Sequence, residues 1–208
     1  MNARISTLAP ALLLRAALLL AGFLAGPASA QIPGVTDVLT APKTLIDRAI
    51  EARSTADIAK DNEIVVKINA IMAEVESIKA STEIYEQRLL ITGLFDDKAV
   101  YDDFEQKVRA VSGVKKLYWH CVYMSKEDQA KANLPGWVTI TAMADKAQAR
   151  LVGTRGVADV NFRTAADTSR TIYLLGRARS QEEAAKALAR VRDGDGVVKV
   201  INYVEVRP

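Results

Sequence analysis

The stretch that decides the fold is residues 170–206, RTIYLLGRARSQEEAAKALARVRDGDGVVKVINYVEV. Its beginning is β-branched and aromatic and alternates up to Gly176, which predicts a half-buried strand that this glycine closes. Ser180 then stands at the N-cap position of a helix, and Glu183 follows three residues later with the spacing of a capping box. The start of the stretch therefore predicts a strand followed by a helix.

The rest of the stretch completes the helix and adds a second strand. Apolar residues recur at helical spacing, at Ala184, Ala187, Leu188 and Val191. Gly194 and Gly196 are expected to end the helix. Alternation with a period of two resumes over residues 198–206, so the whole unit is strand, helix, strand.

The same pattern occurs once earlier, at residues 88–123, RLLITGLFDDKAVYDDFEQKVRAVSGVKKLYWHCVY. A shift of 83 residues aligns the two stretches without a gap and gives identities that include Gly93 with Gly176, Val108 with Val191, Arg109 with Arg192, Gly113 with Gly196 and Val114 with Val197. We infer an internal duplication; two unrelated units with ordinary glycine punctuation are the alternative. In each unit the first glycine is expected to allow a tight exit from the strand. The second is expected to supply a left-handed cap to the helix.

The first thirty residues have the pattern of a secretory signal peptide. Arg4 gives a positive start, an apolar run follows, and Ala28-Ser29-Ala30 is a small-x-small cleavage site before Gln31. A retained membrane anchor is the alternative. Because no cysteine adjoins the cleavage site, no acylated lipoprotein is expected, and the predicted compartment is the periplasm.

Beyond this leader, the pattern predicts two modules of the α+β class. Residues 31–54 form an N-terminal segment with a possible short helix over 43–52, and residues 125–135 form a polar linker. The first module, residues 55–124, is expected to open with a helix starting at Asp57 or Asp61, followed by strands over 83–87 and 89–93. The second, residues 136–208, is expected to have a helix over 137–152, a strand over 157–164 and a hairpin turn over 165–169. Each module is then α-β-β-α-β, a small mixed sheet with two helices on one face.

Charge is distributed unevenly between the two halves. Residues 131–208 carry 13 Lys and Arg against 8 Asp and Glu, whereas residues 55–130 carry 10 against 14. A basic second half suggests an anionic partner, and lipid head groups fit an envelope protein better than nucleic acid. Neutral drift of solvated surfaces is the alternative.

The duplicated pattern behind an export signal resembles tandem BON domains. The matching residues are Gly93, Val108, Val111, Gly113 and Val114 in the first unit, and Gly176, Ala184, Ala185, Val191, Gly196 and Val197 in the second. Further local matches are Arg53-Ser54-Thr55 with Asp61, and Trp137 at the start of the second module. The resemblance implies envelope maintenance and stress tolerance through phospholipid association, without catalysis. It also implies that the opening helix of the second module makes the lipid contact. The missing acylated cysteine is a departure that favours a soluble member over a lipid-anchored one.

The segment from Trp137 is the candidate lipid-binding site. No charge occurs from Trp137 to Ala144, and Lys146 and Arg150 follow. Indole rings favour the membrane interface, and basic residues attract anionic head groups. The predicted lipid-binding residues are Trp137, Val138, Thr141, Lys146 and Arg150. In the alternative interpretation, Trp137 only holds the helix onto its own domain, and the protein is a periplasmic protein-interaction or chaperone-like module.

No catalytic constellation can be assembled from the sequence. His120 and Cys121 are neighbours on a predicted strand, so they point to opposite faces and cannot form a nucleophile–base pair. Cys121, the single cysteine, is expected to be a small buried hydrophobe. The pattern of a calcium loop is absent from both acidic clusters, which are Asp96-Asp97 with Asp102-Asp103, and Asp193 with Asp195. No metal or cofactor is therefore predicted, and Tyr118 and Trp119 are expected to make core or inter-domain contacts.

Overall fold

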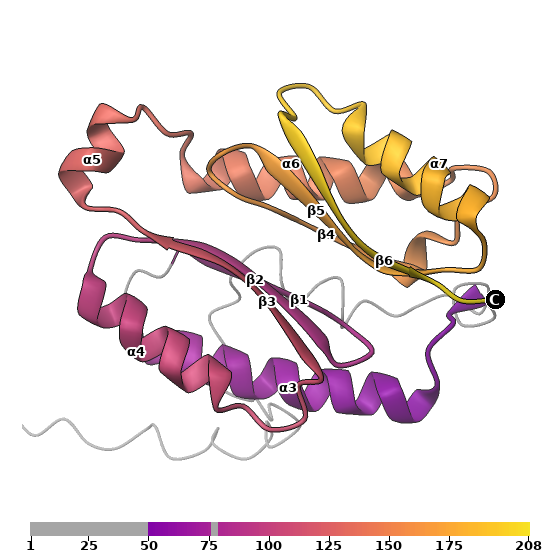
Figure 1. Ribbon diagram of the computed structural model, residues 1–208, viewed down its shortest axis with the longest axis horizontal. Coiled ribbons are helices and arrows are strands. Elements are labelled where there is room, and N and C mark those ends of the chain that lie inside the picture. Colours follow the sequence, from indigo (N-terminus) through magenta and orange to yellow (C-terminus); the bar gives the residue numbers. More distant parts are fainter. Residues whose placement is uncertain (1–49, 76–78) are drawn as a thin grey trace, which may run out of the picture. The chain divides into compact units, whose positions relative to one another are not determined.

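The computed structural model describes residues 50–75 and 79–208 (Figure 1). The first half contains α3 (Thr55–Ala73), β1 (Ala80–Tyr85), β2 (Arg88–Phe95), α4 (Lys98–Arg109) and β3 (Lys116–Tyr123). The second half contains α6 (Trp137–Leu151), a 3-10 turn (Asp159–Asn161), β4 (Phe162–Ala166), β5 (Thr171–Ala178), α7 (Gln181–Arg192) and β6 (Lys199–Val206). A short helix, α5 (Lys126–Lys131), lies in the predicted linker. The predicted signal peptide, and the predicted helix over 43–52 apart from its last three residues, lie outside the described residues.

The two halves have the same sheet topology. In the first sheet β1 pairs antiparallel with β2, and β2 pairs parallel with β3. In the second sheet β4 pairs antiparallel with β5, and β5 pairs parallel with β6. The predicted α+β class is therefore confirmed as two small three-stranded mixed sheets with helices. No helix among the described residues is long and apolar enough to cross a bilayer.

Each sheet buries one face against helices from its own half. In the first half, Ile68 of α3 and Phe104 of α4 are fully buried against Ile84, Ile91 and Cys121 of the strands. These strand residues lie on one face of the sheet because side chains alternate along a strand. The second half repeats the arrangement with Ile140 and Leu151 of α6 and Ala187 and Val191 of α7.

Helix starts follow the capping residues. The hydroxyl of Ser180 accepts the amide of Glu183 (3.1 Å), so α7 begins where the sequence predicts. Ser54 caps α3 in the same way through the amide of Asp57 (3.0 Å). Helix α3 therefore begins at Thr55, and the prediction of a start at Asp57 or Asp61 was wrong because Ser54 was not recognised as a cap.

The first strand of each hairpin has different sequence bounds from those predicted. Strand β1 ends at Tyr85, because Glu86 and Gln87 have positive φ values of 53° and 62° and form the two-residue turn. The predicted strand over 83–87 therefore included the turn itself. Strand β4 begins only at Phe162, after the 3-10 turn, and runs to Ala166, so the predicted span of 157–164 was also wrong.

The two first glycines do not end their strands. Strand β5 continues past Gly176 to Ala178, and β2 continues past Gly93 to Phe95. Gly176 has φ +151°, and a Cβ there would lie 2.1 Å from the carbonyl oxygen of Asn161. These glycines therefore permit a close approach of backbone, not a tight exit. The second glycines, Gly113 (φ +92°) and Gly196 (φ +76°), adopt positive φ as predicted. They do not cap the helices, because the C-caps are Ala110 and Asp193 and the glycines lie in the turns that follow.

The other faces of the sheets meet in a contact that joins the two halves. Its buried residues are Tyr85, Leu90, Ala165, Tyr173 and Leu175, with Tyr118, Ile201 and Tyr203 packed against them. The rings of Tyr118 and Tyr203 stack with their centroids 3.9 Å apart. The Arg88 guanidinium donates hydrogen bonds to the carbonyl oxygens of Gly176 (2.7 Å) and Tyr203 (2.9 Å). Tyr118 thus makes the inter-domain contact expected of it, whereas Trp119 packs on the first core.

Candidate functional site

Helix α6 carries all five residues predicted to bind lipid, but it does not place them on one face. With about 3.6 residues per turn, residues nine positions apart lie about half a turn from each other. Lys146 therefore lies on the far side of the helix from Trp137. Ile140, Ala147 and Leu151 face the core and fix the orientation of the helix.

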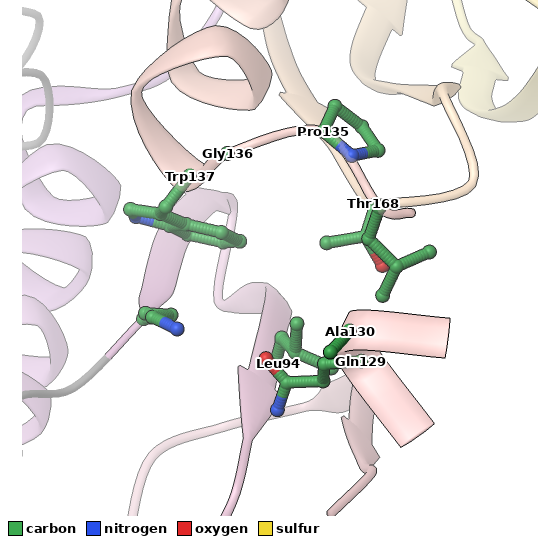
Figure 2. Close-up of a pocket in the computed structure, with 9 residues that line it drawn as sticks. Leu94, Gln129, Ala130, Pro135, Gly136, Trp137 and Thr168 are labelled. Carbon is green, nitrogen blue, oxygen red and sulfur yellow. The ribbon is translucent and has the colours of Figure 1, made fainter. Parts of the chain in front are cut away.

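Trp137 is half-buried and lines a small pocket. Part of its indole packs against the core of the second half. The pocket, of ≈ 250 Å³, is lined by Lys79, Leu94, Gln129, Ala130, Leu134, Pro135, Gly136, Trp137 and Thr168. Figure 2 shows Trp137 and Thr168 on opposite sides of this pocket, with Leu94 and Gln129 near its lower edge in the view. Trp137 therefore both anchors the helix and presents its ring to an open space.

Val138 is the most exposed large apolar residue of the predicted set. Its exposed fraction is 82%, compared with half-burial for Trp137 and Thr141. Lys146 is exposed, and the neighbouring Asp145 is also on the outer surface. Val138 and Lys146 are about 80° apart on a helix, so these two residues share the solvent-facing side of α6.

Arg150 lies elsewhere. Its guanidinium packs over Gly194, at the end of α7, so closely that a Cβ on that glycine would come within 2.6 Å of three guanidinium atoms. The Nη1 atom is buried without a hydrogen-bond partner. Arg150 therefore packs onto the loop after α7 and is not grouped with Trp137 and Val138.

The structure keeps His120 and Cys121 apart, as the alternation of a strand requires. Cys121 is 7% exposed in the first core, where burial raises the pKa of its thiol. His120 instead faces the second half. Its Nε2 is hydrogen-bonded to the Tyr203 hydroxyl (2.8 Å), and its ring centroid lies 4.2 Å from that of Tyr173. Burial lowers the pKa of His120, with Asp167 opposing the shift. His120 therefore takes part in the contact between the halves.

Among the described residues, no group of three or more His, Cys, Asp or Glu side chains is placed to hold a metal ion. The acidic residues singled out in the sequence have structural uses instead. Asp97 caps α4 by accepting the amides of Ala99 (2.8 Å) and Val100 (3.1 Å). Asp102 pairs with Lys98 one turn earlier.

The functional contacts that sequence reasoning missed come from segments distant in the chain. Lys79 and Leu94 of the first half line the Trp137 pocket, and no pattern within residues 136–150 could have indicated them. Asp61 was noticed only as a local match. It is in fact a buried acceptor for the Arg53 guanidinium (3.0 Å) and for the backbone amides of Glu86 (2.9 Å) and Gln87 (2.7 Å).

The fold consists of two α-β-β-α-β units, each with a three-stranded mixed sheet. Residues 141–208 match the BON domain family, so the chain contains a BON domain over these residues. Among curated proteins, none matches the chain in sequence.

Two solved structures of CdsD, a structural protein of the type III secretion system of Chlamydia trachomatis, are similar to this chain. The C-terminal domain of CdsD shares 12% identity over 70% of this chain and 98% of its own length, with a TM-score of 0.29. The second structure shares 13% identity over 70% and 93%, with a TM-score of 0.28. Likeness at this level carries no statement about function.

Proposed function

We propose that this is an exported, non-enzymatic protein that binds anionic phospholipid surfaces peripherally through α6. On this proposal it acts in the periplasm and supports outer-membrane integrity or tolerance of envelope stress. The BON domain at residues 141–208 is consistent with an envelope setting. The excess of basic residues in the second half favours an anionic surface.

The observation that carries this proposal is Val138. It exposes 82% of its surface in the first turn of α6, and the first two turns of this helix carry no charged residue. An exposed apolar residue on an uncharged helix end can enter the boundary between head groups and acyl chains at little desolvation cost. Lys146 lies on the same side of the helix and supplies attraction to anionic head groups.

Trp137 contributes in a different way from Val138. Because it is partly buried against the protein core, it holds the start of α6 in place. Its exposed edge lines the pocket with Lys79. An indole at the exposed start of a helix suits the head-group region of a membrane. Arg150 is left out of the proposed surface because it packs over Gly194.

The test is co-sedimentation with liposomes of anionic and of zwitterionic lipid. Val138→Asp should abolish most of the partitioning to anionic liposomes without changing the melting midpoint. Val66→Asp is the matched control, since Val66 is an exposed valine (67%) on α3 of the first half. Without an acyl anchor, wild-type binding should be weak and should fall with added salt.

A second candidate function is a protein-interaction or chaperone-like module. Val198, 73% exposed just before β6, and Val122, 49% exposed on β3, favour it, because β3 and β6 are the outer strands of their sheets. An outer strand can pair with an added peptide strand. If the folded wild type ignores anionic liposomes at low salt but suppresses aggregation of an unfolded envelope protein, this candidate replaces the first.

A further inference from the structure

A second pocket, in the first half, is remote from α6 in the chain and is lined by lysines. It has a volume of ≈ 300 Å³ and three walls. Successive turns of helix α3 form the first wall, with Lys60, Glu63, Ile64 and Lys67. The loop before β3 forms the second wall, with Ser112, Gly113 and Lys115. The turn between β1 and β2 forms the third wall, with Gln87. A concave site built from three segments can hold a ligand, whereas a scatter of surface lysines cannot.

The charge of the pocket is positive within an otherwise acidic half. Its lining has three lysines and one carboxylate, Glu63, which is paired with Lys67 (2.7 Å). Lys60 and Lys115 form no ion pair within 4.0 Å among the described residues, although both act on Asp57 and lower its pKa after the larger effect of the Ser54 hydroxyl. Two ammonium groups are thus available for an anion in this pocket.

Gln87 adds a polar group that the protein leaves unsatisfied. Its Nε2 donates to the carboxylate of Asp61 (2.8 Å) and to the carbonyl oxygen of Asp57 (3.3 Å), which fixes the orientation of the amide. Its Oε1 is buried with no partner, and the residue is only 2% exposed. A buried acceptor without a partner is costly, so a ligand that brings a hydroxyl donor would gain from meeting it.

The loop contributes further donors. Gly113 has φ +92° in the turn that joins Val111 to Val114, and the amides of Ser112 and Gly113 donate to no backbone carbonyl of the described chain. The Ser112 hydroxyl is within 3.4 Å of Lys67 Nζ. Successive free amides at a residue of positive φ form the kind of concavity that binds oxyanions.

We infer that this pocket is a binding site for a phosphate-bearing anion with at least one hydroxyl, such as hydrogen phosphate or a phosphorylated polyol. Lys60 and Lys115 neutralise the phosphate, the loop amides donate to its oxygens, and Gln87 Oε1 accepts its hydroxyl. This site is separate from α6 and does not depend on the membrane proposal. The ligand is either a soluble phosphate ester or the phosphate of a lipid head group, and the experiment distinguishes these sources.

The second half provides an internal control. The shift of 83 residues places Asp195 at the position of Ser112 and Val198 at that of Lys115. An acidic residue and a valine thus replace the hydroxyl and the ammonium group, although Gly196 keeps the positive φ of Gly113. The loop before β6 should therefore bind no phosphate, and its amides report non-specific effects in the same molecule.

The test is a titration of the folded protein with inorganic phosphate, glycerol phosphate and sulfate, followed through the backbone amide signals. Phosphate and glycerol phosphate should shift the amides of Ser112 and Gly113 and leave Gly196 unmoved. Sulfate, which has no hydroxyl at neutral pH, should bind more weakly because it cannot donate to Gln87 Oε1. Lys60→Gln with Lys115→Gln should weaken phosphate binding by about tenfold or more. Lys98→Gln with Lys126→Gln, which removes the same charge at exposed positions, should not.

The other outcomes of this titration would contradict the phosphate site or identify the source of the phosphate. Equal shifts at Gly113 and Gly196, or equal losses in the two double variants, would reduce the effect to general charge screening and overturn the site. If the soluble phosphates leave Gly113 unmoved while the Lys60 and Lys115 substitutions weaken liposome binding, the pocket takes the phosphate of a lipid head group and not a soluble phosphate ester. If the substitutions also leave liposome binding unchanged, the pocket is not a phosphate site. Val138→Asp should leave the phosphate shifts intact, so failure of the α6 proposal leaves the phosphate site standing.

Discussion

His120 and Tyr203 are hydrogen-bonded to each other (2.8 Å) and stand 83 residues apart, which is the shift that aligns the two halves of the chain. Equivalent positions of the repeat therefore meet each other. Leu90 and Tyr173, also 83 apart, are both buried in the same contact. Such self-complementary pairing is the property of an isologous dimer interface, here formed between two halves of one chain.

The first prediction concerns Arg88, which crosses this contact. Its guanidinium donates to Gly176 and Tyr203 and is 3.4 Å from the carboxylate of Glu205. Arg88→Met should lower the free energy of unfolding by about 2–3 kcal/mol, because the buried carbonyl of Gly176 and the partly buried carbonyl of Tyr203 lose a charged donor. Urea unfolding measures this cost. Arg109→Met, which removes an exposed pair with Glu105, should cost less than about 0.5 kcal/mol, and equal losses in the two variants would show that Arg88 does not hold the halves together.

The second prediction concerns Gly176. A methyl group there would lie 2.1 Å from the backbone oxygen of Asn161 and 2.9 Å from Cα of Phe162. Gly176→Ala should therefore displace β4 from β5 and cost about 3 kcal/mol or more. Gly153→Ala is the control, since Gly153 also has positive φ (+72°) but has open space around it. Its cost should be about 1 kcal/mol from backbone strain alone, as measured by thermal unfolding, and a larger loss in Gly153→Ala than in Gly176→Ala would contradict the packing argument.

The helices were predicted better than the first strand of each half. Ser180 and the apolar spacing from Ala184 to Val191 are local signals, so α7 could be placed from sequence. The start of β1, Ala80-Ser81, has little strand preference of its own and pairs because β2 lies beside it. The position of β1 is therefore set by its pairing with β2 and not by its own sequence.

The candidate site could be predicted only in part for a related reason. The helix that bears Trp137 and Val138 was placed correctly, and Val138 is indeed exposed. Yet helical geometry separates Lys146 from Trp137, and packing on Gly194 holds the Arg150 guanidinium apart from the other predicted lipid-binding residues. The phosphate pocket was missed because its three walls are far apart in the sequence and Gln87 has no motif of its own.

The third prediction concerns Asp61. Its carboxylate accepts hydrogen bonds from Arg53, from two backbone amides and from the Gln87 side chain, with no exposed surface. Asp61→Asn should cost about 3–5 kcal/mol, because Arg53 loses a buried charge partner and one amide must face a donor. Glu63→Gln, an exposed change on the same helix that leaves the core untouched, should cost less than about 1 kcal/mol. Chemical unfolding compares the two, and a mild effect of Asp61→Asn would show that the turn at Glu86 and Gln87 is held by other contacts.

The last prediction concerns pH and the carboxyl of Glu83 on β1. Burial raises its pKa from 4.5 to about 8, with Asp145 of α6 adding to the shift and the buried Arg163 of β4 opposing it. Between these two values the folded protein keeps a proton that the unfolded chain has released, so stability should fall as pH rises through this window and stay low above it.

Glu83→Gln tests this prediction because its side chain remains neutral throughout. The variant should therefore match the wild type near pH 4.5 and become progressively more stable than the wild type towards pH 8, as followed by urea unfolding at several pH values. His120, whose pKa is lowered, contributes the opposite trend below its ordinary value of 6.5. Because it is present in both proteins, the difference between their unfolding free energies isolates Glu83. A difference that does not change with pH would show that Glu83 is ionised in the folded protein and that Arg163 compensates for its burial.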